Sequence, residues 1–488
     1  MGLLSGLLLI YFLTTAPADG GAVSPRVIEA SPGYEAFITP EAQGDDTLTV
    51  VRGQDRTGRT SDGKLPQLSA QEHLRRAGVY MTNRAFPEAR EHFQAVIERY
   101  PTDPLVSSAI YGMGRSYFQD KRYAESVPFF ERLAREFSNT KDGREGLYSL
   151  ASAYLRMGRS QEAAAQYRSY TEQYPQGERI EAAYLNVIDS LREAGQPDEA
   201  VRWIATTREK FPNTATDKNA LFARLRLDIA VSDWAHAVET ANQLIPMPSP
   251  QGVMTSSDEL VYLRAFALER LGRKDEAVNN YMMVSERPDS YYGWLATDRL
   301  MTLTGEQKRS LVMTRAGRTR SQASSAEAQY PAAYREIILR EAKKRNLDPR
   351  FILSIMKQES GFKPRAKSMA AARGLLQLTI DTAQKYAARA GYNNLTEDDL
   401  YRPEVNIAVA CEYIAELTRL FPDLQEAVAA SYNGGEDNAA RWLKRGTHRD
   451  PAVFTSEVGF SETNGYVQKV VSNYRVYKLL YNQALVRQ

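Results

Sequence analysis

The feature that most constrains the fold of this chain is a repeat with a period of 37 residues. Two sequence signals recur at this interval: Tyr100-Pro101, Phe137-Ser138, Tyr174-Pro175 and Phe211-Pro212, and Glu88-Ala89, Glu125-Ser126, Glu162-Ala163 and Glu199-Ala200. A period in the thirties with two amphipathic helices per unit is typical of an α-solenoid, whose units bury their apolar faces only against their neighbours. An irregular helical bundle with chance periodicity is the alternative, and two signals with one period disfavour it.

The units resemble tetratricopeptide repeats, which have a small residue at the contact between their two helices and an aromatic–proline pair at the end of the unit. Gly158 and Gly195 mark the turns between helices, and His236-Ala237 and Glu276-Ala277 continue the series. We therefore expect residues 68–303 to form a tetratricopeptide-like α-solenoid of about six units with a concave surface. Envelope proteins could bind there, although the sequence identifies no partner.

The N-terminus has the pattern of a secretory signal. Residues 1–13 are almost wholly apolar, and Ala16-Pro17-Ala18 supplies a small-residue cleavage site, so residues 1–18 are predicted to be a signal peptide. The absence of Lys and Arg at its start leaves a buried N-terminal helix as the alternative. The run is shorter than the about 20 apolar residues of a stable membrane span. The predicted location is the periplasm, with association with the outer membrane left open.

Residues 19–67 are rich in Gly, Pro, Ser, Thr and Asp and show no sustained apolar period, which predicts a disordered tether, although Leu48–Arg52 could pair as a short strand. Overall charge is balanced, with 62 basic and 60 acidic residues, so we expect no nucleic-acid partner. Cys411 is the only cysteine, which excludes an intrachain disulfide and favours a packed thiol. The four histidines are scattered, and we predict no metal and no cofactor.

A candidate catalytic residue follows from one predicted helix. Asp348 is a good N-cap, Pro349 a good first helical residue and Gly361 a good terminator. The apolar stripe of this helix consists of Ile352, Ile355 and Met356, and the next position at helical spacing is Glu359. Burial raises the pKa of a carboxylic acid, and an acid that keeps its proton can protonate a departing glycosidic oxygen. The alternative is a glutamate that turns to solvent or pairs with an arginine.

Four motifs follow in order along the chain. They are Glu359-Ser360-Gly361-Phe362 with Ser368, Gly374-Leu375-Leu376-Gln377, Ser431-Tyr432-Asn433-Gly434-Gly435, and Glu462-Thr463 with Tyr466-Val467. Together they resemble the catalytic domain of the soluble lytic transglycosylase family, a lysozyme-like α domain that cleaves peptidoglycan. Residues 290–300 resemble the linker signature that precedes this domain in the family. The predicted fold is thus all-α, a tetratricopeptide-like α-solenoid, a loop-like linker at 304–329 and a lysozyme-like domain at 330–488.

The resemblance implies a chemistry and a set of residues. The family cleaves the MurNAc–GlcNAc β-1,4 bond without water, forming 1,6-anhydro-muramyl ends, and Glu359 would be its single acid and then base. Substrate contacts are implied for Ser360, Ser368, Gln377, Tyr432, Asn433 and Glu462. Three of these residues have a structural alternative: Ser368 as a helix N-cap, Gln377 as a partner of buried backbone, and Tyr432 as ordinary core. Tyr466 and Val467 are expected to pack a final helix at 464–485, without a chemical role.

The sequence departs from the family pattern at several positions. Leu376 and Thr379 stand where the family often has methionine, Gly434 replaces alanine, and Asn464 replaces arginine, which puts subsite details and peptide preference in doubt. Two other functions stay open. One is a muramidase of the goose-type lysozyme kind, which would hydrolyse the same bond. The other is an envelope scaffold whose lysozyme-like domain only binds glycan.

Overall fold

The computed structural model describes residues 45–446 and 448–488, and these residues are helical with a few isolated β-bridges. The predicted signal peptide at 1–18 and the first part of the predicted tether lie outside the described residues. Within the described part, the prediction of an all-α chain is confirmed.

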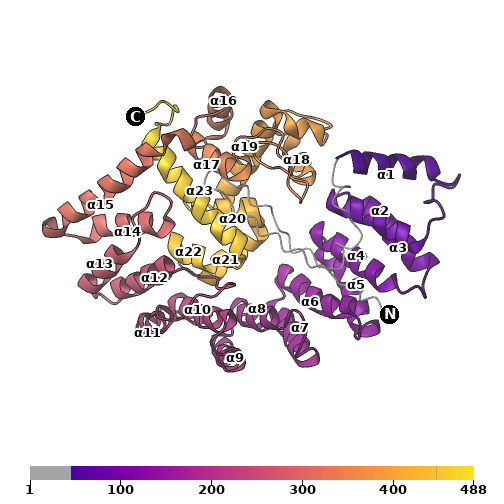
Figure 1. Ribbon diagram of the computed structural model, residues 1–488, viewed down its shortest axis with the longest axis horizontal. Coiled ribbons are helices and arrows are strands. Elements are labelled where there is room, and N and C mark those ends of the chain that lie inside the picture. The colour runs from indigo at the N-terminus through magenta and orange to yellow at the C-terminus, as the bar shows by residue number, and fades with distance from the viewer. Residues whose placement is uncertain (1–44, 447) are drawn as a thin grey trace, which may run out of the picture.

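Six helix pairs form the solenoid, and Figure 1 shows them following one another along a curved path. The helices are α2 Ala70–Thr82, α3 Phe86–Arg99, α4 Val106–Gln119, α5 Tyr123–Glu136, α6 Lys141–Arg156, α7 Ser160–Gln173, α8 Ile180–Glu193, α9 Pro197–Lys210, α10 Ala215–Ala230, α11 Trp234–Leu244, α12 Ser257–Arg270 and α13 Lys274–Met283. Each pair matches one repeat of the sequence.

The two recurring signals have distinct structural roles. The small residue after the recurring glutamate, such as Ala89, Ser126 or Ala163, is fully buried, as a small residue at the contact between two packed helices would be. The recurring aromatic residue is the C-cap of the second helix of its pair, and where it is a tyrosine its hydroxyl can also bond an earlier backbone carbonyl. Tyr174, for example, donates a hydrogen bond to the carbonyl of Ser138 at 3.1 Å. The repeat therefore encodes both the packing within a unit and the contact between units.

Part of the predicted tether is instead a helix. Residues Asp45–Gly58 form α1, with Leu48 and Val51 buried against the first helix pair, so the short strand considered at 48–52 is wrong. The composition of this segment suggested disorder because α1 has few apolar residues. Those few lie one helical turn apart and are covered by α2 and α3, which local composition cannot reveal.

The predicted loop at 304–329 is also wrong, because Glu306–Ser325 form the long helix α15. Its buried face consists of Val312, Arg315, Thr319 and Ala323, which recur at helical spacing. Two of these four buried side chains are polar. Arg315 donates hydrogen bonds to the carbonyl of Val284 at 2.8 Å and to the hydroxyl of Thr297 at 2.9 Å. A buried arginine that caps the end of another helix gives no apolar period, so the sequence pattern concealed this helix.

The C-terminal domain packs around α17 (Pro349–Ser360), whose side chains Ile352, Ile355 and Met356 are fully buried. Its other helices are α16 Arg335–Arg345, α18 Ile380–Ala387, α19 Pro403–Leu420, α20 Gln425–Gly434, α21 Glu436–Gly446, α22 Pro451–Glu457 and α23 Ser461–Leu480, with short 3-10 helices η3 Glu327–Gln329 and η4 Asp398–Tyr401. The helix α14 (Tyr291–Leu303) and α15 join it to the solenoid. The last helix begins earlier and ends earlier than the predicted 464–485. Cys411 is fully buried in α19, and burial raises the pKa of its thiol to about 12, as expected of a packed residue.

The C-terminal domain lies along the inside of the curved solenoid (Figure 1). Its helices α21 and α22 contact α8, α10 and α12, while α23 contacts α14 and α15. The other end of the solenoid reaches the same domain through polar contacts: Arg84, in the turn between α2 and α3, binds both carboxylate oxygens of Asp381 at 2.8 Å. The two parts therefore share an extended interface.

Candidate active site

The helix that carries Glu359 has the ends that its sequence predicts. The Asp348 carboxylate accepts a hydrogen bond from the backbone N–H of Arg350 at 2.9 Å, and Pro349 occupies the first turn. Gly361 ends the helix with a φ of +56°, a left-handed conformation that glycine adopts without strain. Tyr474 of α23 donates a further hydrogen bond to Asp348 at 2.9 Å, so that the start of α17 is tied to α23.

Glu359 lies at the other end of α17 and is 6% exposed. Its Oε1 accepts a hydrogen bond from the hydroxyl of Tyr466 at 2.8 Å. Tyr466, on α23, is itself 6% exposed. A tyrosine hydroxyl that donates to a carboxyl oxygen helps to hold the carboxyl side chain in one orientation. The sequence analysis predicted no chemical role for Tyr466. The structure shows that its hydroxyl contacts the candidate acid.

A loop at residues 373–378 packs against the end of α17, where the hydroxyl of Ser360 donates to the carbonyl of Leu375. Isolated bridges join Arg373 to Lys367 and to Leu378, and Gly374 has a φ of +79°. A Cβ atom at Gly374 would lie 2.1 Å from the carbonyl oxygen of Leu400, so only glycine fits. The loop is therefore built around one close backbone contact.

Asn406, fully buried in α19, holds this loop with its amide. Its Oδ1 accepts from the N–H of Leu376 at 2.8 Å, and its Nδ2 donates to the carbonyls of Arg373 and Leu400, both at 2.9 Å. Three bonds from one amide leave little freedom to the loop. The sequence analysis missed Asn406, because an asparagine inside an apolar helix is also compatible with a solvent-facing side chain.

Three of the predicted substrate-binding residues form hydrogen bonds with backbone carbonyls that hold this loop. The Gln377 amide donates to the carbonyls of Ala366 and Gly374 at 3.0 and 2.8 Å. Tyr432 donates to the carbonyl of Leu376 at 2.7 Å and is 6% exposed. Ser360 is fully buried, and its hydroxyl donates to the carbonyl of Leu375 at 2.7 Å, so the direct substrate contact predicted for Ser360 has no exposed atom to make it.

The other three predicted residues are more accessible. Ser368 is half-buried, and its hydroxyl accepts from the N–H of Ala372 at 3.1 Å, so it caps a loop rather than a helix. Asn433 accepts from the hydroxyl of Thr463 at 2.6 Å, which joins the end of α20 to the start of α23. Glu462 lies exposed in the first turn of α23, one turn before Tyr466. The structure thus brings the second, third and fourth motifs to the end of α17.

Several carboxylates that could have assisted Glu359 have partners elsewhere. Asp381 binds Arg84, Glu412 binds Arg345 at 2.7 Å, and Glu457 binds Arg192. These contacts tie separate elements together and give the three carboxylates structural roles. Among the described residues, no group of three or more His, Cys, Asp or Glu side chains could hold a metal ion.

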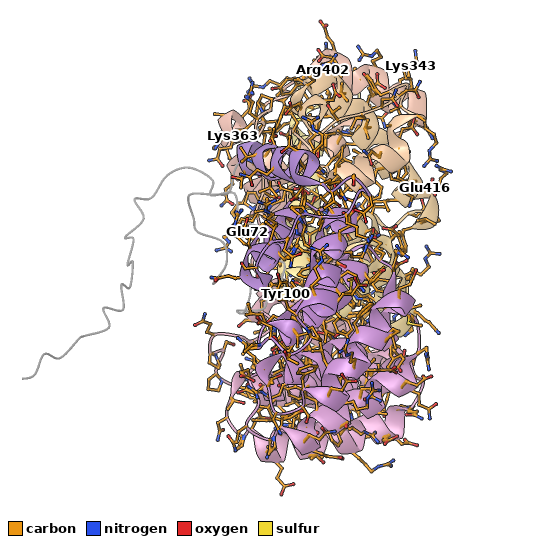
Figure 2. All side chains as sticks on the ribbon, turned by 90° about the vertical axis from the view of Figure 1, so that its right-hand side faces the viewer. Glu72, Tyr100, Lys343, Lys363, Arg402 and Glu416 are labelled. Carbon is orange, nitrogen blue, oxygen red and sulfur yellow. The ribbon has the colours of Figure 1, made fainter. Side chains whose placement is uncertain are left out.

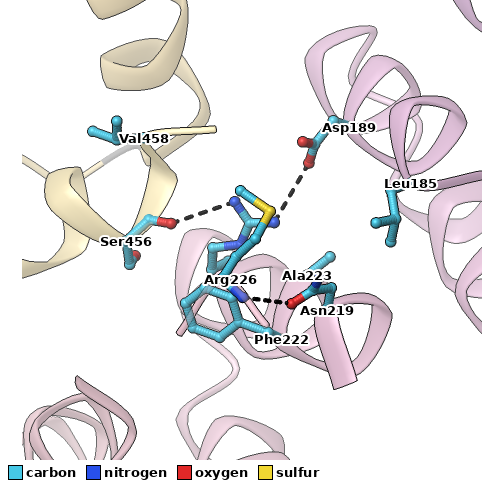
Figure 3. Close-up of a pocket in the computed structure, with 9 residues that line it drawn as sticks. Leu185, Asp189, Asn219, Phe222, Ala223, Arg226, Ser456 and Val458 are labelled. Carbon is cyan, nitrogen blue, oxygen red and sulfur yellow. Dashed lines mark hydrogen bonds and ion pairs between the residues drawn. The ribbon is translucent and has the colours of Figure 1, made fainter. Parts of the chain in front are cut away.

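A small pocket lies away from Glu359, between α8, α10 and the segment after α22 (Figure 3). Its volume is about 30 Å³, room for a water molecule or two and far less than a sugar ring requires. Its charged lining residues are Arg226 and Asp189. Arg226 donates a hydrogen bond to the carbonyl of Ser456 at 3.3 Å and lies 3.6 Å from Asp189. This pocket belongs to the interface between the two parts of the chain.

Two families match the chain. Residues 336–454 match the Transglycosylase SLT domain, a range that contains Glu359, Gln377 and Tyr432. The Tetratricopeptide repeat family matches residues 74–139, 111–178 and 148–215, which are units of the solenoid.

Curated relatives match in the C-terminal part. A putative soluble lytic murein transglycosylase of Haemophilus influenzae is 34% identical over 154 residues, which are 31% of this chain and 26% of the relative. The soluble lytic murein transglycosylase of Escherichia coli is 30% identical over 150 residues, 30% of this chain and 23% of the relative. The chain therefore spans about a quarter of the length of these relatives. A membrane-bound lytic murein transglycosylase C of Edwardsiella ictaluri is 30% identical over 117 residues, 22% of this chain and 33% of the relative.

Solved structures similar to this one include an inactive mutant of the lytic transglycosylase Slt of Pseudomonas aeruginosa, with a TM-score of 0.49 and 21% identity, covering 90% of this chain and 76% of that one. The 70 kDa soluble lytic transglycosylase of Escherichia coli has a TM-score of 0.48 and 17% identity, covering 90% and 85%. The helical structure and the two domain matches confirm the predicted fold class. The chain carries a transglycosylase SLT domain that is C-terminal to a series of tetratricopeptide repeats.

Proposed function

We propose that this protein is a peptidoglycan lytic transglycosylase that cleaves the MurNAc–GlcNAc β-1,4 bond and forms 1,6-anhydro-muramyl ends. One observation carries the proposal: inside the range that matches the SLT domain, Glu359 lies almost buried at the end of a helix and is held by the hydroxyl of Tyr466. A carboxyl group in such surroundings suits the transfer of a proton to an ether oxygen.

In the first step, protonated Glu359 donates its proton to the glycosidic oxygen as the bond from that oxygen to C1 of the muramyl sugar breaks. The GlcNAc unit leaves with a new hydroxyl, and positive charge develops at C1. The N-acetyl group of the substrate can ease this charge, as in other substrate-assisted glycosidases. Glu359 ends the step as a carboxylate, and the Tyr466 hydroxyl stabilises that charge by donating a hydrogen bond.

In the second step, the C6 hydroxyl of the same muramyl sugar attacks C1, and the Glu359 carboxylate takes its proton. The product has a 1,6-anhydro ring, Glu359 is protonated again, and no water is consumed. Because the nucleophile is part of the substrate, the protein needs to orient it more than to activate it. A single carboxylate suffices for both steps, which agrees with the structural partners of the three carboxylates Asp381, Glu412 and Glu457.

The neighbouring residues divide into two groups. Gln377, Tyr432, Ser360 and Asn406 position the loop at 373–378 through backbone carbonyls and amides. Ser368, Asn433 and Glu462 are the accessible members, and we assign to them the contacts with glycan or with peptide.

The proposal also includes location and partners. The protein acts on glycan strands in the periplasm after export by the segment 1–18, and the repeats hold the catalytic domain and offer a surface to envelope proteins. Among the helices that the structure describes, none is long and apolar enough to cross a membrane.

Mass analysis of the fragments released from purified sacculi tests the proposed reaction. Fragments that end in 1,6-anhydro-muramic acid are expected. Fragments 18 Da heavier, with reducing ends, would instead identify a goose-type muramidase. The scaffold alternative predicts binding to sacculi without any released fragment.

A further inference from the structure

A cluster of charged side chains lies where the solenoid meets the SLT domain, and its charges do not balance. Its basic members are Arg192, Arg226 and Arg445, and its acidic members are Asp189 and Glu457. Each of the two carboxylates lies within 3.6 Å of all three guanidinium groups. The cluster therefore holds three positive charges and two negative ones.

The neighbouring acidic residues do not supply the missing negative charge. Glu193 lies 3.5 Å from Arg445, but it accepts hydrogen bonds from Arg441 through both carboxylate oxygens at 3.0 Å, so these two charges offset each other. Glu259 of α12 interacts with Arg226 over a longer range, and burial raises the pKa of its carboxyl, which disfavours the charged form. Among the described residues of this junction, one positive charge is thus uncompensated.

The excess charge is shielded from solvent. On the surface, charged side chains such as Lys343 and Arg402 project into water, which stabilises them (Figure 2). In contrast, the Arg226 side chain is 8% exposed, and those of Arg192 and Arg445 are 2% and 3% exposed. The Nε atoms of these three arginines are buried and have no hydrogen-bond partner in the described part of the chain. A buried guanidinium keeps its proton, so this junction favours an anion that accepts hydrogen bonds.

The pocket drawn in Figure 3 is a cavity at this charge. Arg226 lines it, and the Asp189 carboxylate in its wall is one of the two already counted. Its volume of about 30 Å³ admits a monatomic anion, which is only slightly larger than a water molecule, and excludes a large organic anion. The other lining residues are neutral: Leu185, Asn219, Phe222, Ala223, Met254, Ser456 and Val458.

We propose that this cavity binds a small monatomic anion of the chloride class, which completes the charge balance of the junction. A water molecule would fill the same space but would leave the excess charge uncompensated. Arg192 and Arg226 belong to α8 and α10 of the solenoid, and Arg445 and Glu457 belong to α21 and α22 of the SLT domain. The anion would therefore help to hold the two parts of the chain together, independently of the proposed reaction at Glu359.

The test compares chloride with gluconate, an anion too large for the cavity, at the same ionic strength and on the full chain. Hydrogen exchange of α21 and α22 measures the opening of the junction. An anion that binds only the closed junction lowers the opening equilibrium constant in proportion to its concentration. A tenfold rise in chloride above its dissociation constant should therefore slow exchange about tenfold. Bromide should act like chloride, and gluconate should have no such effect.

A variant assigns the effect to the excess charge. Arg226→Gln removes one of the three positive charges, so the cluster balances and the same rise in chloride should change exchange less than about twofold. The matched control is Arg224→Gln on the same helix, where the lost guanidinium pairs with Asp228 at 2.7 Å, outside this cluster. The control should keep the full dependence on chloride.

Diffraction from wild-type crystals grown in bromide needs no variant. An anomalous peak is expected in the cavity between Arg226, Asn219 and Ser456. If Arg226→Gln does not fold, this peak and the exchange of the wild type together decide the matter.

Three results would overturn the anion site. Equal exchange in chloride and gluconate, with no anomalous peak, would mean that water fills the cavity. A bromide peak without any effect on exchange would mean an adventitious ion only. A full chloride dependence in Arg226→Gln would mean that the anion binds elsewhere. The proposed cleavage reaction is measured separately, by released fragments, and none of these results would alter it.

Discussion

At the scale of single residues, local signals were predictable and distant pairings were not. The N-cap at Asp348, the proline at 349 and the terminating Gly361 depend on a few neighbouring residues, and all three are as predicted. The contact of Tyr466 with Glu359 joins residues 107 positions apart, and that of Asn406 with Leu376 depends on how α19 packs on the loop. Sequence spacing within one helix carries no information about such pairings.

Tyr466→Phe is expected to lower kcat by about ten- to a hundredfold. This loss corresponds to the free energy of one hydrogen bond to a charged carboxylate. The lost donor stabilises Glu359 after it has given up its proton, so the alkaline limb of the pH–rate profile should move to higher pH. Steady-state rates of fragment release across pH measure both effects. Tyr474→Phe is the matched control, because it removes a hydroxyl of the same helix that binds Asp348 rather than the proposed acid. Equal loss of kcat in both variants would contradict the role of Tyr466.

At the scale of secondary-structure elements, the repeat made α2 to α13 predictable, whereas α1 and α15 were missed. The repeated helices carry an apolar stripe that recurs with the period of the units. In contrast, α1 buries few apolar residues, and α15 buries Arg315 and Thr319 among apolar ones. Both missed helices are stabilised by tertiary contacts, which override weak local patterns.

The attachment of α1 depends on a buried polar cluster. Asp55 of α1 accepts hydrogen bonds from Tyr80 at 2.6 Å and from His92 at 3.0 Å, and it also pairs with Arg76. His92 contacts His73 through their Nδ1 atoms at 2.9 Å, while the Nε2 of His73 is buried with no hydrogen-bond partner. Burial, with the neighbouring His92, Arg99 and Arg76, lowers the pKa of His73 from 6.5 to about 4. The negative charge of Asp55 opposes this shift only weakly.

This cluster predicts that α1 and its contacts loosen in mild acid. A histidine whose pKa is lower in the folded state stabilises the fold above pH 6.5, and this stability is lost as the pH falls toward 4, because the unfolded chain binds the proton more readily. The loss should reach about 2 kcal/mol at pH 5 and about 3 kcal/mol at pH 4. Hydrogen-exchange protection factors of α1 to α3 measure it.

His73→Gln should abolish this pH dependence. In contrast, His236→Gln, at an exposed histidine that pairs with Asp233 at 2.6 Å, should leave the behaviour of α1 to α3 unchanged. Protection factors in α1 to α3 that stay constant from pH 7 to pH 4 in the wild type would contradict the role of His73.

At the scale of the whole molecule, two kinds of junction join the solenoid to the SLT domain. Between α8, α10 and the end of α22, the side chains of Arg192 and Glu457 are 2% and 1% exposed and form an ion pair with Arg226 and Arg445 nearby. Burial raises the pKa of the Glu457 carboxyl. The neighbouring Arg192, Arg226 and Arg445 outweigh burial and hold this pKa below its usual range. At the far end of the solenoid, Arg84 and Asp381 pair with side chains 15% and 47% exposed. The first junction is shielded from solvent, and the second is open to it.

Removing one charge should therefore have unequal effects at the two junctions. Glu457→Gln leaves three buried arginines with less compensating charge and should cost about 3 kcal/mol of stability, whereas Asp381→Asn should cost about 1 kcal/mol or less. Denaturant unfolding monitored by hydrogen exchange in α21 and α22 measures the difference. Equal costs would mean that the buried cluster does not determine how the domains are held.

The central claim is that Glu359 supplies the proton for cleavage of the glycan, and the rate of fragment release by Glu359→Gln on purified peptidoglycan tests it most directly. The matched control is Glu404→Gln, the same change at an exposed glutamate at the start of α19. The account predicts at least a thousandfold lower rate for Glu359→Gln with binding to sacculi retained, and an unchanged rate for the control. Release of 1,6-anhydro fragments by Glu359→Gln within tenfold of the wild-type rate would contradict it.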